Sequence, residues 1–180
     1  FEFDHVLSVV AQEVAITINI SPEIRPVRVL GREAEINGRQ VVVQLNQLYS
    51  EHEKYVMLEV ELPATEAGKT RQIARVDISY ANMETRTTDR LSSTVSVNFS
   101  PSDDVVEKNT DAAVMTECVL QVANEQNKLA TTLRDNGDIE GARRVLVGNA
   151  GYLAENASKY KSEKLRLRYV DNTGLSRRLG

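Results

Sequence analysis

The chain has 180 residues, which is the length of one ordinary domain or of a domain with an appendage. Aromatic residues make up 5% and tryptophan is absent, which argues against an aromatic platform that stacks sugars or single-stranded nucleic acid. A net charge of −4 argues against a general nucleic-acid binder, and the single cysteine, Cys118, excludes an intrachain disulfide.

The sequence opens with an apolar segment, FEFDHVLSVVAQ, and does not begin with methionine. We interpret it as part of a longer protein, so that the lack of a signal peptide carries no information about location. No run approaches the ~18 apolar residues that a membrane helix needs, and no membrane span is expected.

Alternation of apolar and polar residues dominates the chain as far as Ser100, which is typical of strands with one face on a core. In the first run, VAITINI, the residues Val14, Ile16, Ile18 and Ile20 share a face. The runs 55–62 and 72–80 each offer four inward positions, so they are expected to form the centre of the core. The predicted strands are 14–20, 26–30, 34–36, 41–45, 55–62, 72–80 and 91–99.

Turn-forming pairs separate these runs, and the sharpest is Asn37-Gly38, a strong signal for a two-residue hairpin. About seven short strands without intervening helices predict an antiparallel β-sandwich of immunoglobulin type over residues 13–100. Because helical periodicity follows, the predicted fold class is α+β.

Residues 101–160 are predicted to form a helical hairpin. Ser100 can cap a helix, and two sets of apolar residues at helical spacing follow. The basic end of the chain, 161–180, has weak periodicity, and between residues 158 and 180 seven Lys and Arg face only two acidic residues. We interpret 161–180 as a solvated, flexible tail; a short helix that touches phosphates or anionic lipid is the alternative.

The stretch RDNGDIEG, between the two predicted helices, contains three acidic residues and two glycines. A calcium loop needs oxygen ligands at alternating positions and a distal glutamate; here Gly137 takes a ligand position and the glutamate is missing. The better interpretation is a turn, in which Gly137 ends one helix and Asp138 caps the next, with Gly141 in the capping-box position.

No residue pattern predicts a catalytic, cofactor-binding or metal site. The only histidines, His5 and His52, are distant in the sequence, and HEKYV lacks the second histidine of a zinc-hydrolase motif. Cys118 lies on the apolar stripe of a predicted helix, where burial raises the thiol pKa and disfavours a nucleophile. DISYA, residues 77–81, departs from a D-x-S-x-S metal motif at Ala81. We therefore expect no enzyme and no cofactor.

Together, LSVVAQ, RPVRVLG, LNQLYSEHEKYVMLEVE and SYAN resemble the region that follows the A domain in bacterial von Willebrand factor type A proteins, and the resemblance extends over residues 1–160. It implies that residues 1–12 are the end of that domain's last helix. The family's metal site lies upstream of that region, so the resemblance assigns no metal ligand here. The resemblance also implies that the protein is bacterial and acts outside the cytoplasm.

The resemblance, together with the lack of a pattern for a catalytic or metal site, predicts a non-catalytic accessory module. This module is expected to bind proteins, including its own upstream A domain. A small-ligand or glycan-binding β-sandwich is the alternative. Such a module requires an apolar pocket or a cluster of exposed tyrosines. An enzyme, the third possibility, requires His5 or His52 to meet carboxylates in a cleft.

Overall fold

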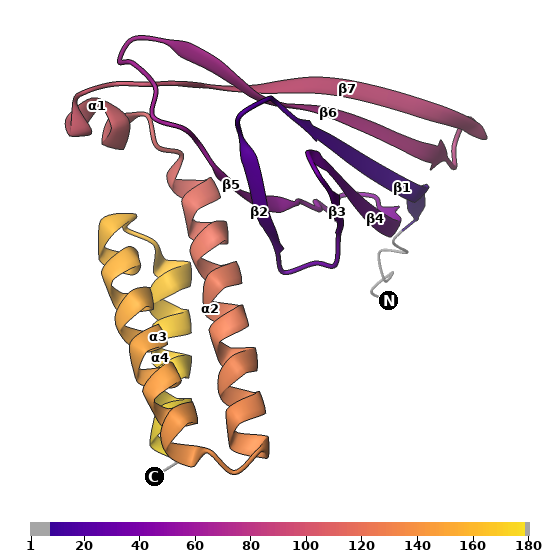
Figure 1. Cartoon of the computed structure of the whole chain (residues 1–180). Helices are drawn as coiled ribbons and strands as arrows, with labels where there is room; N and C mark the ends of the chain where they lie inside the picture. The colour runs from indigo at the N-terminus through magenta and orange to yellow at the C-terminus, as the bar shows by residue number, and fades with distance from the viewer. Residues whose placement is uncertain (1–7, 179–180) are drawn as a thin grey trace. The chain divides into compact units, whose positions relative to one another are not determined.

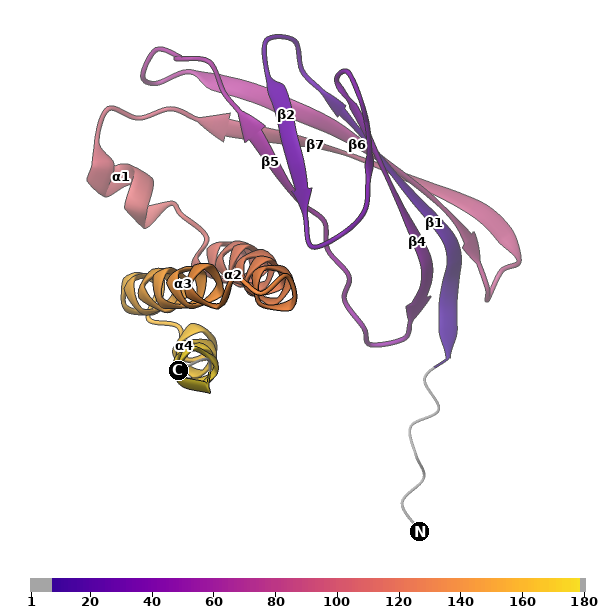
Figure 2. The ribbon, with the colours of Figure 1, turned by 60° about the horizontal axis from the view of Figure 1, so that its bottom comes forward.

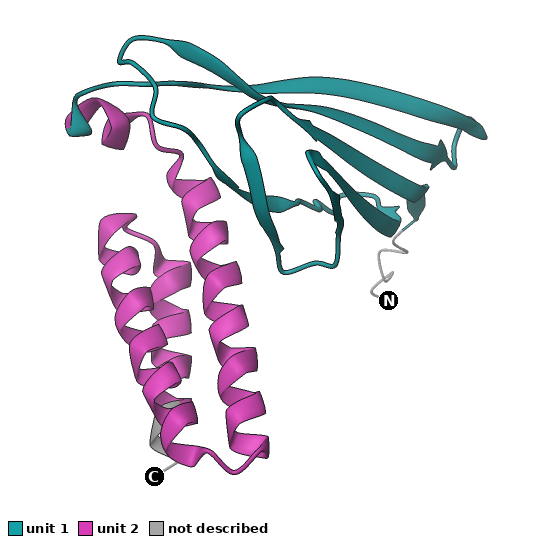
Figure 3. Cartoon of the chain, viewed as in Figure 1, with its two compact units in different colours: residues 1–103 teal, residues 104–180 magenta. Residues whose placement is uncertain are grey.

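The structure is a computed structural model that describes residues 8–178, with side chains described as far as Leu175 (Figure 1). The chain divides into two compact units between Asp103 and Asp104 (Figure 3). Unit 1 contains the β-sheets and unit 2 the long helices, so each has a core of its own.

Unit 1 is built on a five-stranded antiparallel sheet with the order β3-β4-β1-β6-β7. A separate two-stranded antiparallel sheet pairs β2 with β5 (Figure 2). The strands are β1 (Val9–Ile20), β2 (Arg25–Leu30), β3 (Glu35–Asn37), β4 (Gln40–Tyr49), β5 (Met57–Glu61), β6 (Thr70–Asn82) and β7 (Thr87–Asn98).

The core of unit 1 lies between these two sheets and is deepest at β4. Val41 and Val43 of β4 are fully buried, and Val14, Ile18 and Ile20 of β1 are buried beside them. The partly buried apolar residues of β5 pack against the same cluster. The common face predicted for the first run of alternating residues is therefore the core face of β1.

The predicted immunoglobulin-like sandwich is wrong. The second layer has only two strands, β2 and β5, whereas five strands form the main sheet. The error arose because period-two alternation identifies strands and their faces but does not say which strands pair. The centre of the core was also misplaced, since β5 is only partly buried and β4 supplies the fully buried residues.

The expectation of a helix end at residues 1–12 falls partly outside the described residues, because residues 1–7 are not described. Where the chain is described, Val9 already begins β1, which continues past Gln12 to Ile20. These residues pair with β4 and β6, and Ala11 is buried, so they belong to the sheet.

Unit 2 consists of the short helix α1 (Asp103–Lys108), which begins at the unit boundary, and the long helices α2 (Ala112–Asp135), α3 (Ile139–Lys159) and α4 (Glu163–Arg178). Asp111 caps α2, since its carboxylate accepts hydrogen bonds from the backbone N–H groups of Ala113 and Val114. The predicted cap, Ser100, precedes α1 instead.

The turn between α2 and α3 confirms the helix-turn interpretation of RDNGDIEG. Gly137 has a φ of 86°, the left-handed conformation that glycine adopts at helix ends. Asp138 caps α3, accepting a hydrogen bond of 2.8 Å from the backbone N–H of Gly141.

The predicted helical hairpin is incomplete, because a third long helix, α4, occupies the segment expected to be a flexible tail. Leu165 of α4 is fully buried with Val119 and Leu153, and Asn172 is buried two turns further on. Burial of these two residues against α2 and α3 fixes α4 to the bundle. In the described part of the chain, no helix has both the length and the apolar character required to cross a membrane.

Candidate functional site

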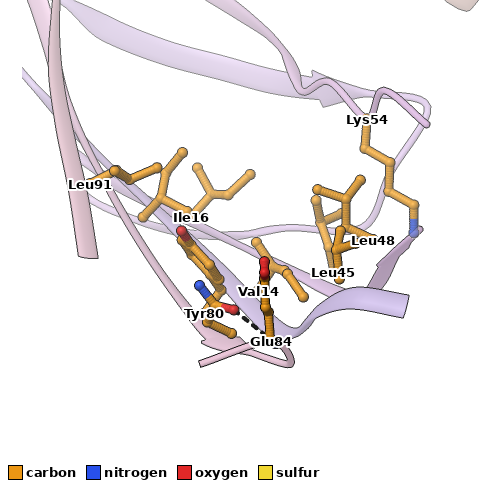
Figure 4. Close-up of a pocket in the computed structure, with 12 residues that line it drawn as sticks. Val14, Ile16, Leu45, Leu48, Lys54, Tyr80, Glu84 and Leu91 are labelled. Atoms are coloured by element: carbon orange, nitrogen blue, oxygen red, sulfur yellow. Dashed lines mark hydrogen bonds between the residues drawn. The ribbon is translucent and has the colours of Figure 1, made fainter. Parts of the chain in front are cut away.

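An apolar pocket with a volume of about 400 Å³ opens on the core face of the five-stranded sheet in unit 1 (Figure 4). Nine of its twelve lining residues are apolar or aromatic, and a volume of this size is typical of small-molecule sites. The nine are Val10, Ala11, Val14 and Ile16 of β1, Leu45 and Leu48 of β4, Ile78 and Tyr80 of β6, and Leu91 of β7.

The pocket lies where β1 and β4 change the face of the sheet to which their side chains point. In a regular strand, residues three apart point to opposite faces. Ala11 and Val14 nevertheless both line the pocket, and so do their pairing partners, Leu48 and Leu45. Between the two β1 residues, Glu13 has a left-handed φ of 51°, and the pairing of β1 with β6 skips a residue there.

A row of four side chains runs across four strands and becomes more exposed toward β7; its last three members, Ile16, Ile78 and Leu91, line the pocket. Val43 pairs with Ile16, Ile16 with Ile78, and Ile78 with Leu91. Val43 is fully buried, whereas Leu91 is 57% exposed. Val95, on the same face of β7, is 46% exposed. The described part of unit 1 therefore leaves the β7 side of this apolar face open to solvent.

Polar residues mark one rim of the pocket, at the turn that joins β6 to β7. The side-chain oxygen of Asn82 accepts hydrogen bonds from the backbone N–H groups of Glu84 and Thr85, at 3.0 and 3.2 Å. The amide of Asn82 donates to Asp89, at 2.7 Å. This hydrogen bond, with one from Thr87, lowers the pKa of Asp89. Asn82 thus holds the turn in shape beside the pocket.

The ammonium group of Lys54, also at the rim, donates a hydrogen bond to the backbone carbonyl of Gln47. Lys54 and Glu84 bring one positive and one negative side chain to the edge of a mainly apolar pocket.

The opposite face of the same sheet carries a polar network that joins four strands. Gln40 of β4 donates to Asn19 of β1 at 3.1 Å, and Asn19 donates to Asp77 of β6 at 3.4 Å. Ser92 of β7 also donates to Asp77. The hydrogen bond from Ser92 is the main cause that lowers the pKa of Asp77, and the guanidinium of Arg75 lowers it further. Asp77 belongs to this solvent-facing network, away from the pocket.

The structure does not bring the sequence's other reactive residues together. His52 is exposed in the segment after β4, where its ring meets the edge of Tyr49 at 6.0 Å between centroids. Cys118 is half-buried in α2, and burial raises the pKa of its thiol. His5 lies outside the described residues. Within residues 8–178 no cluster of His, Cys, Asp and Glu is arranged to hold a metal ion.

Sequence patterns alone did not reveal the pocket. The alternating run that begins at Val14 was recognised. The alternation of faces is broken at Glu13, so the pattern did not place Ala11 on the same face as Val14. Leu45 lies in the predicted strand 41–45, but Leu48 was missed, since its spacing of three residues from Leu45 breaks a period-two pattern.

No protein-family model matches the sequence, and no curated protein matches it. Among solved structures, the chain is similar to von Willebrand factor type A from Catenulispora acidiphila, with a TM-score of 0.58 and 13% sequence identity. The match covers 89% of this chain and 39% of that chain. At this identity, the likeness concerns the fold alone.

A second match, the ArnB paralog VWA2 from Sulfolobus acidocaldarius, covers 95% of this chain and 42% of that one, with 16% identity. Its TM-score of 0.44 is too low to indicate a shared fold. The predicted resemblance is thus supported as a similarity of fold, while a position after an A domain is not shown. The five-stranded sheet, the two-stranded sheet and the helices of this chain have a fold like part of a von Willebrand factor type A protein.

Proposed function

We propose that this chain is a non-catalytic interaction module that binds a protein partner through the apolar face of its five-stranded sheet. The observation that carries the proposal is the open β7 side of that face, where Leu91, which lines the pocket, is 57% exposed and Val95, on the same face of β7, is 46% exposed. Exposed apolar side chains on one face of a folded domain favour a binding site, because leaving them in water costs free energy that a partner can recover.

The partner that we propose is a von Willebrand factor A domain, including one in the same polypeptide. Two facts support this choice. The chain has the fold of part of a von Willebrand factor type A protein, and it spans only 39% of that solved chain. An accessory role also fits the pocket, because nine of its twelve lining residues are apolar or aromatic.

Site-specific photo-crosslinking in the native organism tests the proposal. Leu91 is replaced by p-benzoylphenylalanine, and the captured proteins are identified by mass spectrometry. The matched control is the same replacement at Val147 of α3, which is 58% exposed, close to the value for Leu91. We expect position 91, but not position 147, to capture a polypeptide that contains an A domain. Equal capture at both positions, or no A-domain protein at position 91, would contradict the proposal.

A small apolar ligand is the second candidate, and the pocket itself favours it. The pocket combines an apolar lining with a few polar groups at its rim, Lys54, Asn82 and Glu84, which is the usual composition of a ligand site. A glycan fits less well, because Tyr80 is the one aromatic residue among the described lining residues.

Native mass spectrometry of the gently purified chain distinguishes this second candidate. A bound ligand would appear as a stoichiometric mass increment, which replacement of Leu48 by tryptophan should remove by filling the pocket. If the wild-type chain carries no such increment, the small-ligand candidate is rejected and the protein-binding proposal is unaffected.

A further inference from the structure

The outer edge of β7 has the features of a site for an added strand. β6 pairs with the inner edge of β7 along its whole length, from Thr70 opposite Asn98 to Asn82 opposite Thr87. Within the described residues, no strand pairs with the outer edge. The N–H and C=O groups that point outward from such an edge form a template for another strand.

Asp89 and Arg90 place charges near the start of this edge, but the part of β7 that follows lacks the usual features that prevent strand pairing. Proteins protect exposed edges with charged residues, proline, bulges or very short strands. The segment from Leu91 to Asn98, LSSTVSVN, contains neither charge nor proline. The register irregularity in this pair places its extra residue, Ile73, in β6, so that β7 is not bulged.

The two faces of β7 determine what the added strand must look like. Leu91 and Val95 point to the apolar face, whereas Ser92 and Thr94 lie on the polar face, opposite Asp77 and Arg75 of β6. A strand that continues the sheet must therefore place apolar residues at every second position. Pairing with the eight uncharged residues requires a segment about 26 Å long, at ~3.3 Å per residue.

We propose that a partner protein adds an extended segment with alternating apolar residues to the outer edge of β7, covering Leu91 and Val95 and closing the open side of the pocket. This inference rests on the proposed function and specifies how the partner binds. An amphipathic helix fits less well, because a helix satisfies its own backbone groups and makes no use of those at the β7 edge.

The test uses the full chain and a synthetic peptide with the sequence of β6, residues 70–82, which already carries the apolar alternation that pairs with β7. Its control is a permuted peptide of the same composition in which the apolar residues are adjacent. Amide hydrogen exchange followed by NMR reports on the outward N–H groups of β7, and calorimetry gives the affinity. We expect the β6 peptide, but not the permuted peptide, to slow exchange along β7.

Two substitutions on β7 separate strand addition from other modes of binding. Val95→Lys places a charge on the apolar face, whereas Thr94→Lys places the same charge on the polar face one residue away. We expect V95K to weaken peptide binding about tenfold or more, and T94K to change it less than about threefold. Circular dichroism checks that both variants fold, which is expected because Val95 is nearly half exposed.

Each remaining outcome overturns the inference in a distinguishable way. No binding of the β6 peptide, or equal loss in V95K and T94K, contradicts strand addition. Binding without slower exchange in β7 also contradicts it, but leaves the proposed protein-binding face intact if position 91 still crosslinks to an A domain. Concentration-dependent self-association that protects β7 without peptide would show that a second copy of the chain occupies the edge.

Discussion

Asn149 of α3 donates a hydrogen bond of 2.9 Å to the backbone carbonyl of Ala123 in α2. The side chain of Asn149 is buried, and its amide also donates to the side-chain oxygen of Asn127, again at 2.9 Å. Asn172 makes an equivalent connection from α4 to the carbonyl of Leu146 in α3, at 3.3 Å. Two buried asparagines therefore link the three long helices in sequence.

Replacing Asn149 by alanine should destabilise unit 2 by about 1–3 kcal/mol, because a buried interhelical hydrogen bond is lost. The measurement is urea unfolding followed by the helical circular dichroism signal. Asn156→Ala is the control, since its amide bonds only to the carbonyl of Tyr152 in the same helix, and we expect a change within about 0.5 kcal/mol. Equal losses in both variants would show that Asn149 does not fix the packing of α2 and α3.

Leu45 and Leu91 both line the pocket but should respond differently to truncation. Leu45→Ala removes a buried side chain and should cost about 2–5 kcal/mol, whereas Leu91→Ala should change stability by less than about 0.5 kcal/mol because Leu91 is mostly exposed. Thermal unfolding of the isolated chain measures both. A large loss of stability in the Leu91→Ala variant would mean that this part of β7 is covered in the free chain.

The cap of α3 predicts a thermodynamic coupling between Asp138 and Gly141. A Cβ added at Gly141 would lie 2.1 Å from a carboxylate oxygen of Asp138, so Gly141→Ala must displace the capping side chain. Loss of the cap costs about 1 kcal/mol, which offsets the gain of about 1 kcal/mol from alanine in a helix.

Gly141→Ala should therefore be nearly neutral alone but stabilising by about 1 kcal/mol in an Asp138→Ala background. Chemical unfolding of the two single variants and the double variant completes the cycle. Additive effects would mean that the carboxylate of Asp138 does not constrain residue 141.

Asp77 predicts a dependence of unit 1 stability on pH. Its pKa is lowered in the folded chain, first by the hydrogen bond from Ser92 and then by Arg75. A lowered pKa means that the ionised carboxylate stabilises the fold; the contribution is complete above the unfolded value of about 4 and is lost as pH falls through the folded value.

Ser92→Ala should shift the NMR-titrated pKa of Asp77 upward and make acid unfolding less steep. Thr94→Ala, on the same face of β7, should leave that titration unchanged. If the pKa of Asp77 does not change in the Ser92→Ala variant, another group must lower it.

Cys118 should react slowly with maleimides in the folded chain. Burial raises the pKa of its thiol, so the reactive thiolate is scarce at neutral pH. The reference is a Cys118→Ala, Val114→Cys variant, which places the thiol at an exposed position of the same helix. Mass spectrometry should show slow labelling of Cys118 in the folded chain and faster labelling after urea is added. Rapid labelling of the folded wild type would contradict this environment.

The strands of unit 1 were predictable because alternation is a local property, and every predicted strand overlaps an observed one. The turn at Asn37-Gly38 was nearly right: Asn37 still pairs with Gln40, so the loop residues are Gly38 and Arg39. Pairing between distant strands has no such local signal, which is why the division into five and two strands was missed.

Helix α4 was missed for a specific reason. Its inward positions include Leu165, Tyr169 and Asn172, at spacings of four and three residues, but Asn172 is polar. A pattern that counts only apolar residues therefore ends after one turn. The pocket was equally hidden, because it depends on a change of phase that two strands undergo together.

That shared change of phase in β1 and β4 limits how the sheet can accept insertions and deletions. Ala11 pairs with Leu48 and Val14 with Leu45, so the two strands keep one register between these two pairs. Losing one residue from β1 alone, such as Glu13, would shift the pairing of β1 with β4 by one residue on one side of the deletion. The side chains of β1 there would then point to the other face of the sheet. We therefore expect a length change in β1 at this position to be tolerated best when β4 changes by the same number of residues.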